Sequence, residues 1–130
     1  MGKRVQMMAA LLVGWLLVGG VAPADERNTV EELNQAPAAL AGEPVTLQGI
    51  VVRVNADIMG RNFVHLVDGT GQQGETITLS TGDLPEIGDR AVVNGTLILD
   101  RDFGAGYVYP VLIEDARVSV YGRADSGNAE

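Results

Sequence analysis

The sequence contains no cysteine among its 130 residues. Disulfide bonds, thiol catalysis, iron–sulfur clusters and zinc–thiolate sites are therefore excluded. Histidine occurs once, and lysine is absent after Lys3. Most pairs of a nucleophile with a neighbouring base are excluded as well, because few side chains remain that could serve as that base.

Basic residues are scarce. The chain has nine Lys and Arg against 17 Asp and Glu, and two of the nine, Lys3 and Arg4, lie in the first 24 residues, which hold no acid. Residues 25–130 thus carry seven basic and 17 acidic side chains, a net charge of −10. This argues against general nucleic-acid binding, which depends on Lys and Arg neutralising phosphates. It argues equally against docking on anionic lipid.

The first 24 residues have the pattern of a secretory signal peptide. Lys3 and Arg4 precede an uninterrupted apolar run over residues 7–22, and Ala22 and Ala24 form the small-x-small site that a signal peptidase cleaves. The run is shorter than the roughly 18–20 apolar residues that span a bilayer. We therefore predict a signal peptide over residues 1–24, cleavage after Ala24, and a periplasmic or secreted protein without a membrane anchor.

Apolar residues alternate with period two in five segments after residue 44, which predicts strands over residues 45–54, 62–67, 75–80, 90–99 and 107–120. The alternation changes phase at Gly49 and again near Glu114 and Asp115. We expect a bend in the first strand, which lets it serve two sheets, and a bulge in the last. Residues 28–40 predict a helix that Thr29 and Glu32 cap and that Pro37 interrupts or ends.

Five strands with irregularities in the first and last predict an all-β fold, a small five-stranded Greek-key OB-fold barrel with a short N-terminal helical segment. An SH3-like barrel is the main alternative. Residues 25–44 form the helical preface and linker, residues 45–121 the barrel and residues 122–130 a disordered tail. So small a barrel has no interior pocket that could shift the pKa of a catalytic carboxylate pair, which predicts a protein that is not an enzyme.

Several short motifs resemble the NrfJ-related family of exported bacterial OB-fold proteins. They are GIVV over residues 49–52, IMGRN over 58–62, HLVDGTG over 65–71, GD at 88–89 and DRDFGAGY over 100–107. The resemblance extends over residues 29–120, and the string from residue 58 to 71 is its most specific part. It implies an OB-fold of the kind often labelled as nucleic-acid binding. This chain lacks the lysines that are frequent in the family, which argues against such a role.

OB-folds bind ligands over strands two and three, between the loop joining strands one and two and the loop joining strands four and five. Here these loops are residues 55–61 and 100–106, and we call the region between them the mouth. Residue types that are rare elsewhere in the chain gather there. The predicted ligand-binding residues are Met59, Arg61, Asn62, Phe63, His65, Arg101, Phe103, Tyr107 and Tyr109.

Several of these residues also have a structural interpretation. If Val64 and Leu66 face the core, Phe63 and His65 face the ligand, but a lone histidine often only bonds its neighbours. Phe103 and Tyr107 either stack on a base or sugar or hold down the glycine-rich loop.

The mouth also suggests one metal. Met59 and His65 together are the side chains that would suit copper in its Cu(I) state. These two ligands leave the ion under-coordinated, so a third would have to come from a partner or a second copy. Copper is the one cofactor that the sequence suggests.

Two functions from different classes follow. The first is a periplasmic, non-enzymatic binding or accessory module that grips a partner protein or small ligand at the mouth, linked to respiratory or metal-site maturation. The second is an oligonucleotide- or oligosaccharide-binding OB domain. The acidic composition favours the first. A basic face around Phe63 and His65 would instead favour the second.

Overall fold

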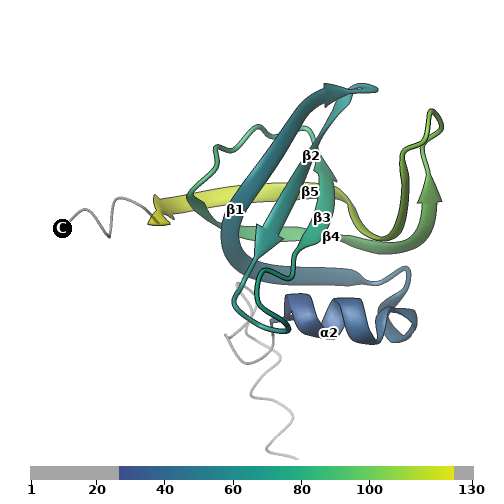
Figure 1. Ribbon diagram of the computed structural model, residues 1–130, viewed down its shortest axis with the longest axis horizontal. Helices are drawn as coiled ribbons and strands as arrows, with labels where there is room; N and C mark the ends of the chain where they lie inside the picture. The colour runs from purple at the N-terminus through teal and green to yellow at the C-terminus, as the bar shows by residue number, and fades with distance from the viewer. Residues whose placement is uncertain (1–26, 125–130) are drawn as a thin grey trace, which may run out of the picture.

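The structure, a computed structural model, describes residues 27–124, which form a five-stranded β-barrel with one short helix against its lower end (Figure 1). The predicted signal peptide and residues 125–130 of the predicted tail lie outside the described residues. No helix within residues 27–124 is long and apolar enough to cross a membrane. The elements are α2 (Val30–Gln35), the 3-10 helix η2 (Pro37–Leu40), β1 (Pro44–Ile58), β2 (Arg61–Val67), β3 (Ile77–Thr81), β4 (Asp89–Asp102) and β5 (Val108–Arg123).

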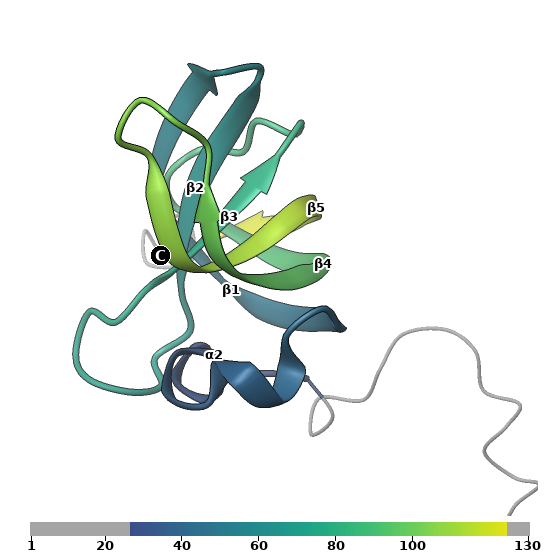
Figure 2. The ribbon, with the colours of Figure 1, turned by 90° about the vertical axis from the view of Figure 1, so that its right-hand side faces the viewer.

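The strands close into a barrel in the order β1-β2-β3-β5-β4, and β4 pairs back with β1 (Figure 2). The β3–β5 pairing is parallel and the other four are antiparallel. A five-stranded Greek-key barrel of this kind is the OB-fold, so the predicted fold class is confirmed. Closure leaves the central strands without an unpaired edge, which protects them from pairing with other chains.

Strand β1 serves both sides of the barrel, as predicted. Residues Pro44–Ile50 pair with β4, and the remainder of the strand, from Ile50 to Ile58, pairs with β2. The phase change, however, is not at Gly49. Residues 45, 47, 49 and 51 all face inward, and the register with β2 slips at Val52, which is 40% exposed. Gly49 has a different role, because a Cβ atom there would lie 2.3 Å from the carbonyl oxygen of Val67.

The predicted bulge in the last strand is confirmed. The β4–β5 register shifts between Asn94 and Thr96, and Asp115 has a φ of 52°. The amide of Asp115 donates to Ser80 Oγ on β3 at 3.1 Å. The bulge thus lies where β5 turns from β4 towards β3, which a closed barrel requires.

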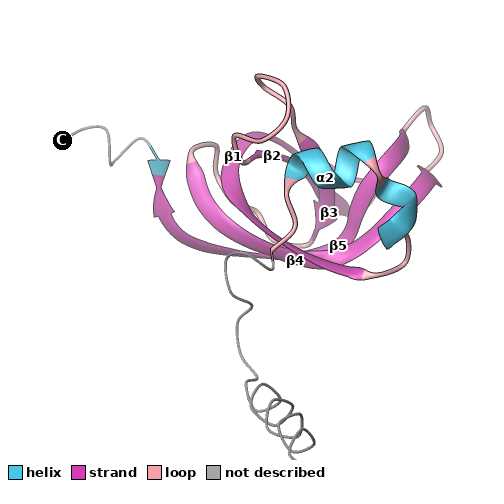
Figure 3. Ribbon diagram, turned by 90° about the horizontal axis from the view of Figure 1, so that it is seen from below, coloured by secondary structure: helices cyan, strands magenta, loops and turns pink. Residues whose placement is uncertain are grey.

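Helix α2 covers the lower end of the barrel (Figure 3). It buries Val30 and Leu33 completely against the core. The predicted capping box is present, since Thr29 accepts from the amide of Glu32 and Glu32 accepts from the amide of Thr29. Asp68 Oδ2 accepts from the amide of Val30 at 2.9 Å, which attaches the start of the helix to the end of β2.

Several predicted boundaries were wrong. Strand β4 continues to Asp102 rather than ending at residue 99, and β5 continues to Arg123, so residues 122 and 123 belong to the barrel and not to a disordered tail. The first hairpin extends almost to its tip, so the predicted loop over residues 55–61 is reduced to the two-residue turn Met59–Gly60. Strand β3 begins at Ile77 rather than at residue 75, because Glu75 belongs to the preceding turn. Its Oε1 accepts from the amide of Gln72 at 2.9 Å, and its Oε2 accepts from Asn34 Nδ2.

Candidate functional site

The mouth lies between the β1–β2 turn and residues 103–107 of the β4–β5 loop, both on the side of the barrel away from α2 (Figures 1 and 2). Met59 and Gly60 have φ values of 52° and 81°, the positive values of a type I′ hairpin turn. Met59 is 45% exposed at the tip. Its position is therefore set by the turn, and its side chain is accessible.

Four aromatic side chains form what we call the mouth cluster: Phe63, Phe103, Tyr107 and Tyr109. The Phe63 ring centroid lies 5.3 Å from those of Phe103 and Tyr109, and 6.4 Å from that of Tyr107. Phe63 points away from Val64 and Leu66, as predicted, but it is completely buried. The expectation that Phe63 is open to a ligand is corrected, because the β4–β5 loop covers it. Phe103 and Tyr107 hold this loop down by packing against Phe63 of the barrel.

Two arginines lie against the mouth cluster. The guanidinium carbon of Arg61 is 4.8 Å from the Phe103 ring centroid, and that of Arg101 is 4.4 Å from it. Both are cation–π distances. Arg101 Nε also donates to Glu114 Oε2 at 3.0 Å, which holds its guanidinium in place. Tyr107, in the mouth cluster, is 37% exposed. The mouth therefore presents a fixed cationic and aromatic surface.

His65 is half-buried beside the mouth. Arg53 is its partner on β1 and Thr78 its partner on β3. Burial, and secondly the charge of Arg53, lower the pKa of His65 below its usual 6.5. The imidazole is therefore mostly neutral at pH 7.

Asn62 holds loops together. Its Oδ1 accepts from the amide of Asp57 at 2.9 Å, and its Nδ2 donates to the carbonyl of Asp83 at 2.8 Å. The first bond lies within the β1–β2 hairpin, and the second joins this hairpin to the β3–β4 connection. Both polar atoms of the Asn62 side chain are therefore bonded within the protein, which is a structural role that the sequence did not reveal.

The expectation that one copper ion can touch both Met59 and His65 is corrected by the strand register. Both residues lie on the first hairpin, but His65 is four residues along β2 from Arg61, about 13 Å at the rise of a strand, and Met59 lies beyond Arg61. Within residues 27–124, no three His, Asp or Glu side chains gather where they could hold a metal ion. The structure does not bring the proposed pair of copper ligands together.

A groove of about 590 Å³ at the other end of the barrel was not predicted. Its lining comes from five separate parts of the chain: the segment before α2, the middle of β1, the β2 end with its following turn, the start of β4 and the end of β5. The lining residues are Arg27, Asn28, Thr29, Gln48, Gly49, Ile50, Val67, Asp68, Gly69, Thr70, Arg90 and Tyr121. No local motif could have indicated it, because only the barrel brings these segments together.

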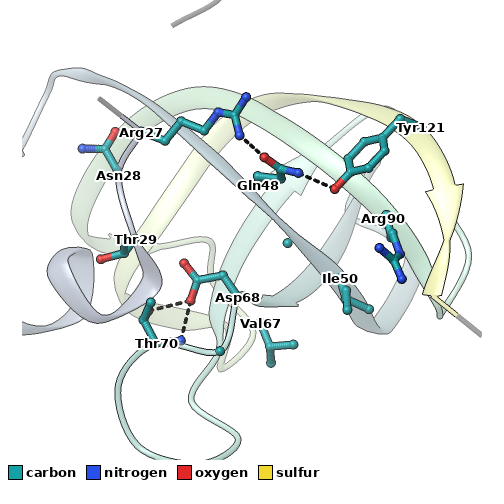
Figure 4. Close-up of a pocket in the computed structure, with 12 residues that line it drawn as sticks. Arg27, Asn28, Thr29, Gln48, Ile50, Val67, Asp68, Thr70, Arg90 and Tyr121 are labelled. Carbon is teal, nitrogen blue, oxygen red and sulfur yellow. Dashed lines mark hydrogen bonds between the residues drawn. The ribbon is translucent and has the colours of Figure 1, made fainter. Parts of the chain in front are cut away.

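A chain of hydrogen bonds crosses this groove (Figure 4). Arg27 Nη1 donates to Gln48 Oε1, and Gln48 Nε2 donates to the hydroxyl of Tyr121. Asp68 lies at the other side, where Oδ1 accepts from both the amide and the hydroxyl of Thr70. The groove thus combines two guanidiniums and a phenol with the apolar side chains of Ile50 and Val67.

The charge around the mouth bears on the choice between the two functions. Three of the seven arginines in residues 25–130, namely Arg53, Arg61 and Arg101, lie on the face of Phe63 and His65 or at its edge. Acidic residues lie there as well, because Arg101 is paired with Glu114, and Asp57 and Asp102 belong to the two hairpins that border the mouth. The sequence matches no protein-family model and no curated protein, so its resemblance to the NrfJ-related family stays a prediction.

Proposed function

We propose that this protein is a non-enzymatic binding module of the bacterial periplasm that engages a partner protein or a small ligand at the mouth. The proposal combines the signal peptide predicted for residues 1–24 with the OB-fold of the described part. An accessory role in respiratory or metal-site maturation is the physiological setting we propose for it.

The observation that supports this proposal is the surface formed by Arg61, Arg101 and Tyr107 over the mouth cluster. Arginine and tyrosine are among the residues that contribute most at binding interfaces. Both guanidiniums already lie on the Phe103 ring at 4.8 and 4.4 Å. Because these side chains are held before binding, a partner would cost them little conformational entropy. Met59, 45% exposed, adds apolar surface at the tip of the first hairpin, and Val108, 56% exposed, begins β5 directly after the loop.

The partner can be identified through a photo-crosslinking amino acid at Val108, introduced into the full-length precursor in living cells. The matched control position is Arg117, which is also exposed on β5 but nine residues further along. The proposal predicts a discrete adduct from position 108 and none from 117. Equal adducts from both positions, or none from 108 while the protein accumulates normally, would contradict it.

Binding of an oligonucleotide or oligosaccharide is the second candidate, and the aromatic rings of the mouth cluster with the two arginines that lie against them favour it. Aromatic rings and arginines are the groups that stack on bases in OB-folds. Fluorescence anisotropy with a short single-stranded DNA and a labelled oligosaccharide separates the two functions. Saturable binding of DNA that weakens with salt and is lost in Arg61→Gln would favour the second function, whereas the net charge of −10 for residues 25–130 predicts none.

A further inference from the structure

We propose that the groove at the α2 end of the barrel binds a small organic anion, in which a carboxylate or phosphate is joined to an apolar or aromatic body. This site is separate from the mouth. Strand β2 has its mouth end at Arg61 and its groove end at Val67, and β5 runs from Val108 at the mouth to Tyr121 at the groove. The two sites are therefore about 20 Å apart along β2.

The size and composition of the groove suit a small molecule. Its volume of about 590 Å³ lies within the roughly 300–1,000 Å³ of ligand pockets. Ile50 and Val67 supply apolar surface, and the Tyr121 ring is 53% exposed beside them. The hydrogen bond from Gln48 to the Tyr121 hydroxyl fixes this ring, which a flat apolar body could stack against.

The groove carries two positive charges, although the chain as a whole is negatively charged. Arg27 and Arg90 line it in a chain whose net charge is −8. Asp68 is the acidic residue of the lining, and its two carboxylate oxygens already accept from Val30 and Thr70. An incoming anion would therefore meet two guanidiniums and a carboxylate whose acceptor sites are engaged with the protein.

Both arginines have N–H groups that do not donate to any other residue of the described range. The exposed guanidinium of Arg90 makes no ion pair or hydrogen bond with another residue of the described range 27–124. Arg27 uses Nη1 on Gln48, while its Nε is buried without an acceptor in the same range. A buried donor left unpaired costs about 1–3 kcal/mol. An oxyanion is the group that would satisfy such donors, because the planar guanidinium matches carboxylate and phosphate oxygens.

The test is a titration of the purified, ¹⁵N-labelled protein followed by NMR. The probes are phenyl phosphate and benzoate, which distinguish phosphate from carboxylate. Benzyl alcohol serves as the uncharged body, and inorganic phosphate and acetate as anions without a body. We expect saturable shifts of the Gly49, Gly69 and Tyr121 amides with at least one aromatic anion, and much weaker binding of the three controls.

Arginine variants make the test specific. Arg90→Gln removes an exposed side chain and should weaken binding about tenfold or more, the loss of a charge-assisted hydrogen bond. Arg117→Gln, at an exposed position outside the groove, should bind as the unchanged protein does. The spectrum itself reports whether each variant is folded.

Three results would overturn the proposal: no saturable shift with either aromatic anion, unchanged affinity in Arg90→Gln, or shifts spread over exposed arginines outside the groove. Amides of the mouth, such as those of Met59 and Val108, should not respond. The titration therefore succeeds or fails independently of the function proposed for the mouth.

Discussion

The two ends of this barrel differ in how their space is used. At the mouth, four aromatic rings fill the face on which OB-folds bind ligands, and one of them, Phe63, is completely buried. At the α2 end, a groove of about 590 Å³ stays open between Arg27, Arg90 and Tyr121. Four of the five aromatic residues after residue 24 therefore gather where a loop has to be held down, whereas the open space is bordered by the fifth, Tyr121, and by two arginines.

Phe63→Ala should have the largest effect on stability. Removing this ring leaves a cavity among Phe103, Tyr107 and Tyr109 and should lower the free energy of unfolding by about 3–5 kcal/mol. Tyr121→Ala at the other end removes a ring that is 53% exposed and should cost about 0.5 kcal/mol. Urea unfolding followed by circular dichroism measures both. Equal losses would show that the two ends are packed alike.

Gly49→Ala tests the close approach of β1 to β2 at the groove. Its Cβ would lie 2.3 Å from the carbonyl oxygen of Val67, so we expect a loss of about 1–3 kcal/mol. Gly82→Ala is the matched control, because a Cβ there meets nothing within 4 Å and the backbone φ is not positive. That change should be neutral or stabilise by up to about 1 kcal/mol. A tolerated Gly49→Ala would contradict the strand geometry at the groove.

Asp68→Ala tests how the helix is attached beside the groove. Val30 would lose the acceptor of its amide, and the turn would lose two bonds from Thr70. We expect a loss of about 1–2 kcal/mol. Amide exchange should accelerate at Val30 but not at Leu97 in the core. Glu43→Gln, a change at an exposed side chain, is the control and should leave both rates unchanged. Unaltered exchange at Val30 would show that Asp68 does not hold the helix.

The smallest expected effect is the pH dependence due to His65. The pKa of His65 in the fold is below its ordinary 6.5. At pH values between these two pKa values, the unfolded chain therefore binds more protons than the folded protein does. Stability should thus fall as the pH drops below about 6.5 towards the folded pKa, and this contribution should be constant above 6.5. The imidazole signal of the one histidine in the sequence gives the pKa by NMR.

Arg53→Gln sharpens this measurement at the mouth face. It removes the smaller of the two causes of the shift, so the pKa of His65 should rise part of the way back. A pKa at or above 6.5 in the unchanged protein would mean that His65 is neither desolvated nor close to Arg53.

The fold could be predicted from the sequence because its signals are local. The capping box of Thr29 and Glu32, the alternation around Val64 and Leu66 and the phase slip at Asp115 each depend on neighbouring residues. The position of the β1 irregularity could not be predicted. The glycine at position 49 is required by the close carbonyl of Val67, 18 residues away, and does not mark a change of phase.

The candidate site was harder to predict for the same reason. Alternation placed Phe63 on the outer face, but only the folded β4–β5 loop shows that the face is covered. The distance between Met59 and His65 depends on how far the hairpin extends, and this in turn depends on a two-residue turn. The groove requires five segments to meet, which no pattern along the chain encodes.

The most direct test of the proposed function is the crosslinking yield from position 108 in Arg61→Gln, compared with Arg117→Gln. Arg61 is placed on the Phe103 ring, and a cation–π contact at such a site contributes only about 0.5–1 kcal/mol to stability. The protein should therefore stay folded while the yield of the adduct falls about tenfold, as for a residue central to an interface. An unchanged yield in Arg61→Gln, or an equal fall in Arg117→Gln, would contradict binding at the mouth.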